Sequence, residues 1–232
     1  MTNPSTDGGF AVVEMFTSQG CNSCPPAEEL LSEIERDARV RGQNVFALGF
    51  HVDYWDDLGW PDQFADAAYT ARQEAYARAF GTRGLYTPQM VVNGSVEFVG
   101  SDRRRAADAI MSAVGSTAAA TQVTLSVANL GNDRVMVDYR TERPPERATL
   151  HVAVVERDLT SDIARGENAG RTLRQDNVVR AFRSVGLDTG RGQVELATPP
   201  DLDARNASVV GYVQEDGDRA IVGATAIELS TA

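Results

Sequence analysis

The chain has few cysteines, histidines and tryptophans, and it has no long apolar segment. Each of these three residue types occurs twice in 232 residues. No run approaches the roughly 18 apolar residues that a membrane-spanning helix needs, so a membrane span is excluded. Basic residues are also in the minority, with 22 Lys and Arg against 33 Asp and Glu and a formal net charge of −11. Nucleic acid is therefore not expected as a partner, because its binding rests on clustered positive charge.

The scarcity of metal ligands and the composition of the N-terminus bear on cofactor and location. A closed four-ligand zinc site would need residues from distant segments, and no metal or other cofactor is expected. The first nine residues lack a basic segment followed by an apolar one, so no signal peptide is predicted. The chain as it stands reads as cytoplasmic, or as periplasmic or secreted if a leader has been removed.

The two cysteines stand together as Cys21-Asn22-Ser23-Cys24, between a strand pattern at 10–16 and a helical pattern. A helix N-terminus offers unpaired N–H groups and a positive dipole that favour a thiolate over a thiol. The position of the pair therefore favours thiol–disulfide chemistry. A structural disulfide, buried thiols and metal binding are the alternatives.

Strand and helix patterns alternate over the first half of the chain. A helix is expected from the prolines at 25 and 26 to Gly42, followed by a nearly all-apolar strand at 44–50. Strand, helix and strand indicate a right-handed parallel crossover. A second helix is expected from Pro61 and Asp62 to Gly81. Its buried stripe is predicted to be Phe64, Ala68, Ala71, Ala75 and Ala79.

A hairpin and a third helix complete this half. Asn93 and Gly94 lie between two β-rich runs and predict a two-residue turn. The helix that follows is expected to be capped by Ser101 or Asp102. Its predicted inward residues are Ala106, Ala107, Ile110, Met111 and Val114. The resulting order is βαβαββα.

Beyond a small-residue linker at 116–121, the composition becomes rich in short strand patterns separated by turn residues. These patterns lie at 123–127, 134–140, 148–156, 176–185, 192–197, 207–215 and 219–229. Their spacing predicts an antiparallel sandwich. The segment 165–171 is expected to be a solvated surface loop.

The βαβαββα order, the Cys-x-x-Cys after the first strand and the proline before the third strand resemble the thioredoxin fold. The chain more specifically resembles a bacterial family of secreted thioredoxin-like proteins catalogued as a domain of unknown function. The segments that carry this resemblance are 13–26, 50–56, 59–60, 86–90 and 98–101, with a looser likeness at 165–173 and 176–179. It implies a mixed α/β fold, with a thioredoxin-like domain at 8–116 and a smaller all-β sandwich-like domain at 121–230.

Within this resemblance, Cys21 is the predicted nucleophile, with an exposed sulfur of lowered pKa, and Cys24 the buried resolving cysteine. Gly20 departs from the tryptophan usual before the first cysteine. Because Pro25 follows Cys24, the backbone of Cys24 is expected to lie outside the helical region, at the cap. Glu14 is predicted either to be a buried acid of raised pKa that exchanges protons with Cys24, or to face solvent.

The resemblance also implies a cis peptide bond between Thr87 and Pro88 that faces the dithiol. The backbone of Thr87 is then expected to pair with an extended substrate segment, and the flanking Tyr86 and Gln89 to contact it.

His51 and Trp55 are further candidates at the same edge of the sheet. His51 ends the second strand, which makes it a candidate acid–base partner or ligand, or else a structural hydrogen-bonding residue. Trp55 is a candidate for lining the adjoining cleft, although aromatic residues at such places usually belong to the core.

These observations predict a thiol–disulfide oxidoreductase that exchanges disulfides with protein or small-molecule thiols through Cys21 and Cys24. The alternative is a non-catalytic protein that binds a partner or a soft metal such as copper, with His51 as a third ligand.

Overall fold

The structure is a computed structural model that describes residues 8–116 and 121–229. Its helices are α1 (Pro25–Arg41), α2 (Ala67–Phe80) and α3 (Arg103–Gly115), with short 3-10 helices η1 (Asp53–Leu58) and η2 (Ala204–Asn206). Its strands are β1 (Ala11–Thr17), β2 (Val45–His51), β3 (Gln89–Val92), β4 (Val96–Val99), β5 (Gln122–Gly131), β6 (Arg134–Glu142), β7 (Ala148–Glu156), β8 (Leu159–Asp162), β9 (Thr172–Gln175), β10 (Val178–Gly186), β11 (Arg191–Ala197), β12 (Ala207–Glu215) and β13 (Ile221–Glu228). None of the helices in the described ranges has the length and apolar character needed to cross a membrane.

One eight-stranded mixed sheet runs through both halves of the chain, in the order β13-β12-β7-β10-β2-β1-β3-β4. The halves meet where β10 pairs in parallel with β2, at Val178 and Gly49. The N–H of Gly49 donates to the carbonyl oxygen of Asn177 at 2.7 Å. The mixed α/β class is confirmed. The division into domains at 8–116 and 121–230 stays a prediction, and strands of both segments share this sheet.

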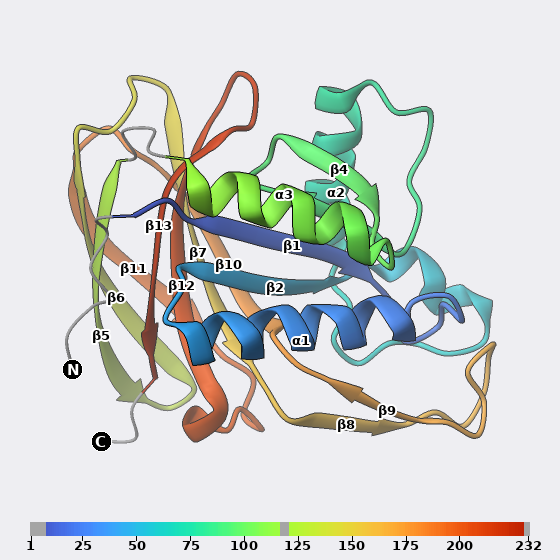
Figure 1. Cartoon of the computed structure of the whole chain (residues 1–232). Helices are drawn as coiled ribbons and strands as arrows, with labels where there is room; N and C mark the ends of the chain where they lie inside the picture. Colours follow the sequence, from blue (N-terminus) through green and yellow to red (C-terminus); the bar gives the residue numbers. More distant parts are fainter. Residues whose placement is uncertain (1–7, 117–120, 230–232) are drawn as a thin grey trace.

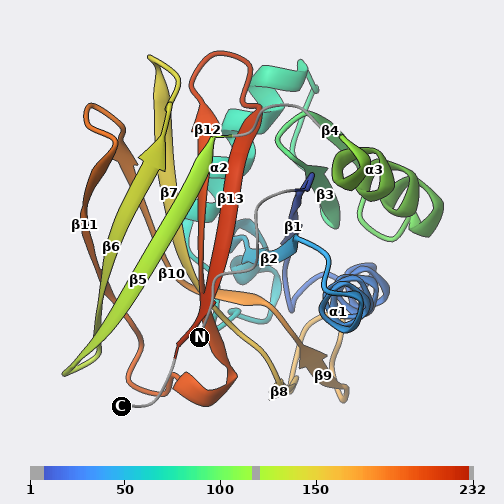
Figure 2. The same ribbon diagram turned by 60° about the vertical axis from the view of Figure 1, so that its left-hand side comes forward.

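Helix α2 covers one face of the large sheet, and α1, α3 and the three-stranded sheet β11-β6-β5 lie over the other (Figures 1 and 2). Helices α1 and α3 pack on β1 to β4, and the three-stranded sheet β11-β6-β5 packs on β7, β12 and β13. A third core lies under α2, where residues of β1 and β2 meet residues of β7, β10 and β12. This third core joins the halves, because it contains buried aromatic side chains from both of them.

Local sequence signals set several element boundaries as predicted. Helix α1 ends at Gly42, whose left-handed φ of 64° a glycine adopts at little cost. Asn93 and Gly94, with φ of 47° and 66°, form the turn between β3 and β4. Asp102 caps α3, and its side chain accepts a hydrogen bond from the N–H of Arg105.

The prediction for α2 was wrong in its start and in its buried face. The helix begins at Ala67, because Asp62 is used in a tertiary hydrogen bond and Asp66 is the residue that caps the helix. The predicted alanine stripe is largely exposed: Ala68, Ala71 and Ala79 face outward. The buried positions are Tyr69, Arg72, Gln73 and Tyr76.

Smaller differences concern α3 and the second half. Ala107 and Met111 were expected to face inward, but both are exposed, and Ala106 is the buried residue of α3. The hairpin of β8 and β9 was not predicted, because its strands have four residues each and mixed polarity. Most of the predicted linker, residues 117–120, lies outside the described residues.

A buried ion pair lies at the centre of the core under α2. Glu14 of β1 accepts hydrogen bonds from Arg72 of α2, at 2.6 Å from Nε and 3.1 Å from Nη2. The hydroxyls of Tyr76 and Tyr212 also donate to the Glu14 carboxylate. Gln214 of β12 accepts from Arg72 at 3.3 Å and donates to Tyr76 at 2.8 Å. Strands from both halves of the sheet are therefore held by one charged network.

We predict that Glu14→Gln lowers the free energy of unfolding by about 3–5 kcal/mol, because it leaves the buried guanidinium of Arg72 without its counter-charge. Urea denaturation followed by circular dichroism measures this change. The matched control is Glu74→Gln, which removes the acid of an exposed i, i+4 pair with Arg78 on the same helix and should change stability little. Equal effects of the two variants would contradict a structural role of the buried pair.

Candidate functional site

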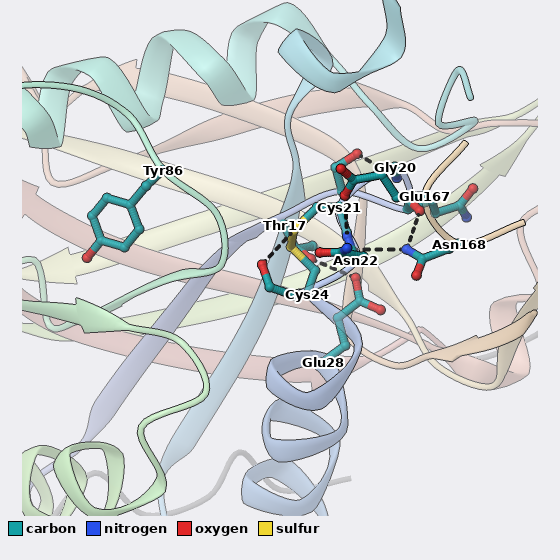
Figure 3. The surroundings of a disulfide bond; sticks show 12 residues. Thr17, Gly20, Cys21, Asn22, Cys24, Glu28, Tyr86, Glu167 and Asn168 are labelled. Carbon is teal, nitrogen blue, oxygen red and sulfur yellow. Dashed lines mark hydrogen bonds between the residues drawn. A yellow bond between two sulfur atoms is a disulfide. The ribbon is translucent and has the colours of Figure 1, made fainter. Parts of the chain in front are cut away.

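Cys21 and Cys24 form a disulfide at the carboxyl end of β1, immediately before α1 (Figure 3). Cys24 is the N-cap of α1, as expected, but its φ of −79° and ψ of −38° are helical, which corrects the prediction made from the proline that follows it. Both cysteines are fully buried, so the expected exposure of Cys21 was wrong. Neighbouring segments cover the disulfide in this state.

The positive end of the α1 dipole lies at the sulfurs, but no backbone N–H group of the first helical turn is free to bind them. Pro25 and Pro26 have no N–H, and the N–H groups of Ala27 and Glu28 both donate to the carbonyl oxygen of Cys24. The hydroxyl of Ser23 lies 3.3 Å from the Sγ atom of Cys21. Stabilisation of a thiolate here depends more on side chains and on the helix dipole than on backbone hydrogen bonds.

The loop between β8 and β9 holds the cysteine loop in place. Asn168 is fully buried, and its amide nitrogen donates to the carbonyl oxygens of Gln19 at 2.9 Å and Cys21 at 3.0 Å. The N–H of Asn22 donates to the carboxylate of Glu167 at 3.1 Å. The expectation of a solvated surface loop at 165–171 was therefore wrong at its centre, because Asn168 binds two backbone carbonyls of the N-terminal half.

A buried carboxyl group lies beside the disulfide. Glu28, one turn into α1 from Cys24, points toward Cys24 and Thr17 in Figure 3. The hydroxyl of Thr17 donates to the Glu28 carboxylate at 2.7 Å. Burial raises the pKa of Glu28, and the charge of His51 and the Thr17 hydrogen bond offset only part of the rise. Glu28 can therefore hold a proton at a pH where an exposed glutamate has lost it.

His51 and Asp62 form a buried ion pair next to Glu28. Nδ1 of His51 lies 2.6 Å from Oδ2 of Asp62, which also accepts from the N–H of Gln19 at 2.7 Å. Burial acts to lower the pKa of His51, but the charge and hydrogen bond of Asp62 outweigh it and raise that pKa. The pKa of Asp62 is lowered, because His51 and two backbone N–H groups outweigh its burial.

The predicted cis peptide bond between Thr87 and Pro88 is confirmed. Neighbouring side chains fix the loop that contains it: Gln73 of α2 donates to the carbonyl oxygen of Tyr86 at 2.8 Å and to Gln89 at 3.0 Å. The hydroxyl of Tyr86 donates to Glu97 at 2.5 Å, and its ring points away from the disulfide in Figure 3. Gln89 is buried and also donates to Glu97.

Apart from the residues around the cis proline, the predicted site residues lie in three different places: Cys21 and Cys24 with His51, Trp55, and Glu14. Cys21 and Cys24 lie together with His51 close by, but His51 is buried and bound to Asp62, so it is not accessible from solvent. Trp55 is half-buried and packs against the core under α2, and its Cβ approaches Gly20 so closely that a side chain at position 20 would crowd it.

Glu14 is the third case. It is buried, which excludes the solvent-facing alternative, and its carboxylate oxygens are occupied by Arg72, Tyr76 and Tyr212. Its partners therefore lie under α2 and do not include a cysteine. In the described ranges, no group of three or more Cys, His, Asp and Glu side chains is arranged to hold a metal ion.

Three residues of the site, Glu28, Asn168 and Asp62, were not predicted from the sequence. For Glu28 and Asn168 the sequence did contain a usable signal. Glu28 lies four positions after Cys24, the spacing that puts two residues on one helix face. Asn168 lies in the segment 165–173, over which the family resemblance extends. Asp62 was taken as a helix start and had no separate signal, because its pairing with His51 is a tertiary contact.

We predict that the two histidines titrate on opposite sides of about pH 6.5, the ordinary histidine value. Asp62 raises the pKa of His51, whereas burial and the charge of Arg72 hold the pKa of His151 well below that value. Proton NMR of the two imidazole rings measures both transitions. An Asp62→Asn variant should bring the His51 transition down and leave that of His151 in place.

This ion pair also has a defined effect on stability. The contribution of His51 is complete below about pH 6.5 and is lost as the pH rises through its raised pKa. The contribution of Asp62 is lost only as the pH falls through its lowered pKa. A His51 transition at or below about pH 6.5 in the wild type would contradict the buried ion pair.

Comparison with known proteins gives a family and a related structure. The model of the family described as protein of unknown function (DUF1223) matches residues 12–214. A structural genomics target from Agrobacterium tumefaciens is 29% identical, covers 98% of each chain and superposes with a TM-score of 0.71. A domain of the outer membrane lipoprotein Omp28 from Porphyromonas gingivalis, 12% identical, covers 48% of this chain and 97% of that domain with a TM-score of 0.31. No curated protein matches the chain.

Because the family model spans most of the sequence, and the site described above lies within the matched residues, the chain belongs to the DUF1223 family of proteins of unknown function.

Proposed function

We propose that the chain is a thiol–disulfide oxidoreductase that exchanges electrons with thiols or disulfides of proteins or small molecules through Cys21 and Cys24. The observation that carries the proposal is the Cys21–Cys24 disulfide at the first turn of α1, beside a buried carboxyl group of raised pKa. Inert structural disulfides have no need of such a proton-holding neighbour. Thiol–disulfide exchange needs such a neighbour, because each turnover forms and consumes a thiolate and releases and takes up a proton.

The arrangement of the N-terminal half supports a thioredoxin-like interpretation of residues 8–116. Strands β1 and β2 pair in parallel across α1, β1 and β3 pair antiparallel, and β3 and β4 form a hairpin before α3. The cis Thr87–Pro88 bond precedes β3. In this proposal, β5 to β7 and β10 to β13 form the sandwich-like part, whose two layers are the sheet β11-β6-β5 and the end of the large sheet.

Exchange from the disulfide state proceeds in two displacements. A substrate thiolate attacks the sulfur of Cys21, forms a mixed disulfide and releases Cys24 as a thiolate. A second substrate thiolate then attacks the substrate sulfur of that mixed disulfide and releases Cys21. Two electrons pass to the protein, the substrate leaves as a disulfide, and the reverse sequence reduces a substrate disulfide.

Glu28 fits the role of proton donor to the Cys24 thiolate. Its raised pKa keeps a proton available, and it lies one turn from Cys24 on α1 (Figure 3). In the reverse direction, the Glu28 carboxylate takes the proton from the Cys24 thiol before the thiolate attacks. The buried state of both cysteines requires the covering segments, including the loop of Asn168, to yield when a partner docks.

Reduction of insulin with a thiol donor tests the proposed reaction. We expect turnover by the wild type, none by Cys21→Ser, and a trapped mixed disulfide with Cys24→Ser. In the Cys24→Ser variant the free Cys21 thiolate attacks an insulin disulfide, but no second cysteine remains to resolve the mixed disulfide. Alkylation of the reduced protein across a pH series measures access to each sulfur. The proposal fails if neither sulfur is labelled in the folded protein and no reductant opens the disulfide.

The role of Glu28 has a separate test. We expect Glu28→Gln to slow reduction of the disulfide by about 10²-fold at a pH where Glu28 is protonated, and to remove the corresponding inflection from the pH–rate profile. Glu29→Gln is the matched control, because Glu29 is the next residue on α1 and is exposed. A Glu28→Gln profile that keeps the wild-type inflection would rule out proton transfer by this carboxyl group.

A further inference from the structure

A hollow lies beside α2, on the face of the large sheet opposite to α1. It has a volume of about 490 Å³ and is bounded by α2, β7, β10 and β12. Volumes of about 300–1,000 Å³ are typical of small-molecule sites. Its helix side is formed by Ala68, Ala71 and Ala75 of the predicted stripe, of which Ala68 and Ala71 are exposed and Ala75 is half-buried. Their small side chains leave the space open between α2 and the strands.

The wall of this hollow carries positive charge and no carboxylate. Arg72, Arg183 and Arg219 line it, and no Asp or Glu does. Arg72 is neutralised by Glu14 beneath the wall. Within the described part of the chain, Arg183 and Arg219 form no ion pair, although the protein as a whole has a net charge of −11. Arg183 and Arg219 therefore bring two positive charges to the lining that no ion pair in the described residues occupies.

Polar side chains form the floor, and two of them, His151 and Gln214, are buried. His151 lies with Nδ1 at 2.7 Å from the hydroxyl of Ser184 and with Nε2 at 3.1 Å from Oε1 of Gln214. Burial, together with the charges of Arg72 and Arg219, keeps the pKa of His151 well below its ordinary value. The imidazole of His151 therefore adds no positive charge of its own to this wall, whose charge comes from the arginines.

The hollow also has an apolar side. The ring of Phe182 stacks on His151, with 5.4 Å between the ring centroids, and lines the space opposite the alanines of α2. The site thus combines an apolar slot with guanidinium donors, which are the groups that bind carboxylate and phosphate oxygens.

We propose that this hollow binds a small organic anion, with its carboxylate or phosphate group on Arg183 and Arg219 and its apolar part between Phe182 and the alanines of α2. The site is independent of the cysteines, and its ligand does not take part in disulfide exchange.

Calorimetry and NMR with simple probes test this proposal. Benzoate and phenyl phosphate carry both an anionic group and an apolar ring. Inorganic phosphate has the anionic group alone, and benzylamine has the ring with a positive charge. We expect at least one ring-bearing anion to bind with a Kd below about 1 mM and more tightly than inorganic phosphate, and benzylamine not to bind. The bound anion should also raise the NMR titration midpoint of His151 and leave that of His51 unchanged.

Variants locate the binding and separate it from folding. The double variant Arg183→Gln with Arg219→Gln should bind the anion at least about tenfold more weakly than the wild type. Arg41→Gln with Arg104→Gln is the control for equal charge removed from exposed positions elsewhere. Ala71→Phe fills the slot from an exposed helix position and should also abolish binding. Thermal melting confirms that each variant is folded.

Three outcomes would overturn the proposal. They are the absence of anion binding at about 10 mM probe, equal weakening in the two arginine double variants, and binding of benzylamine as tight as that of benzoate. Because Cys21→Ser should bind the anion normally, a failed exchange reaction and a failed anion site are distinguishable.

Discussion

The arrangement of the two halves depends on the buried network around the ion pair of Glu14 and Arg72, because Tyr212 and Gln214 of β12 join this N-terminal pair. The backbone link between them is narrow, because β10 and β2 pair at Val178 and Gly49. The charged network reaches further, from β1 through α2 to Tyr212 and Gln214 of β12. A buried ion pair adds little net stability over an apolar pair, but it penalises any packing that separates its members. Its role here is therefore to fix the position of α2 over the junction between the two halves.

The direction of Arg72 sets the remaining faces of α2. With Arg72 and Tyr76 turned toward Glu14, Gln73 on the adjacent side reaches the carbonyl oxygen of Tyr86 and the side chain of Gln89. The opposite side then presents Ala71 to the hollow. One helix thus connects the core with the loop of the cis proline and with the cationic hollow, and a rotation of α2 about its axis would disturb all three.

Sequence reasoning succeeded where the signal is local. The turn at Asn93 and Gly94 and the end of α1 at Gly42 follow from backbone preferences of one or two residues. It failed where a contact with a residue distant in the sequence decides which side chains are buried. The alanines of α2 match an apolar stripe better than Arg72 and Gln73 do, yet the polar residues are buried because Glu14 and Gln89 lie opposite them.

The same distinction explains the candidate site. The cysteines and the cis proline were visible as a motif, but the residues that set the electrostatics around the cysteines come from several segments. Asp62 lies in the loop before α2, and Asn168 lies between β8 and β9. Hydrophobic periodicity carries no information on which buried acid pairs with which histidine. Glu28 was within reach of helix geometry alone, because it is one turn from Cys24.

The charges beside the disulfide favour a coupling between the redox state and the proton on Glu28. His51 and Asp62 compensate each other, so the remaining charge next to the sulfurs depends on Glu28. With the disulfide intact, no negative charge lies on sulfur. A Cys24 thiolate formed on reduction adds one at close range, and like charges in a buried site raise the pKa of the neighbouring carboxyl group. Reduction would therefore draw a proton to this pair, and the reduction potential should fall as the pH rises through the pKa of Glu28.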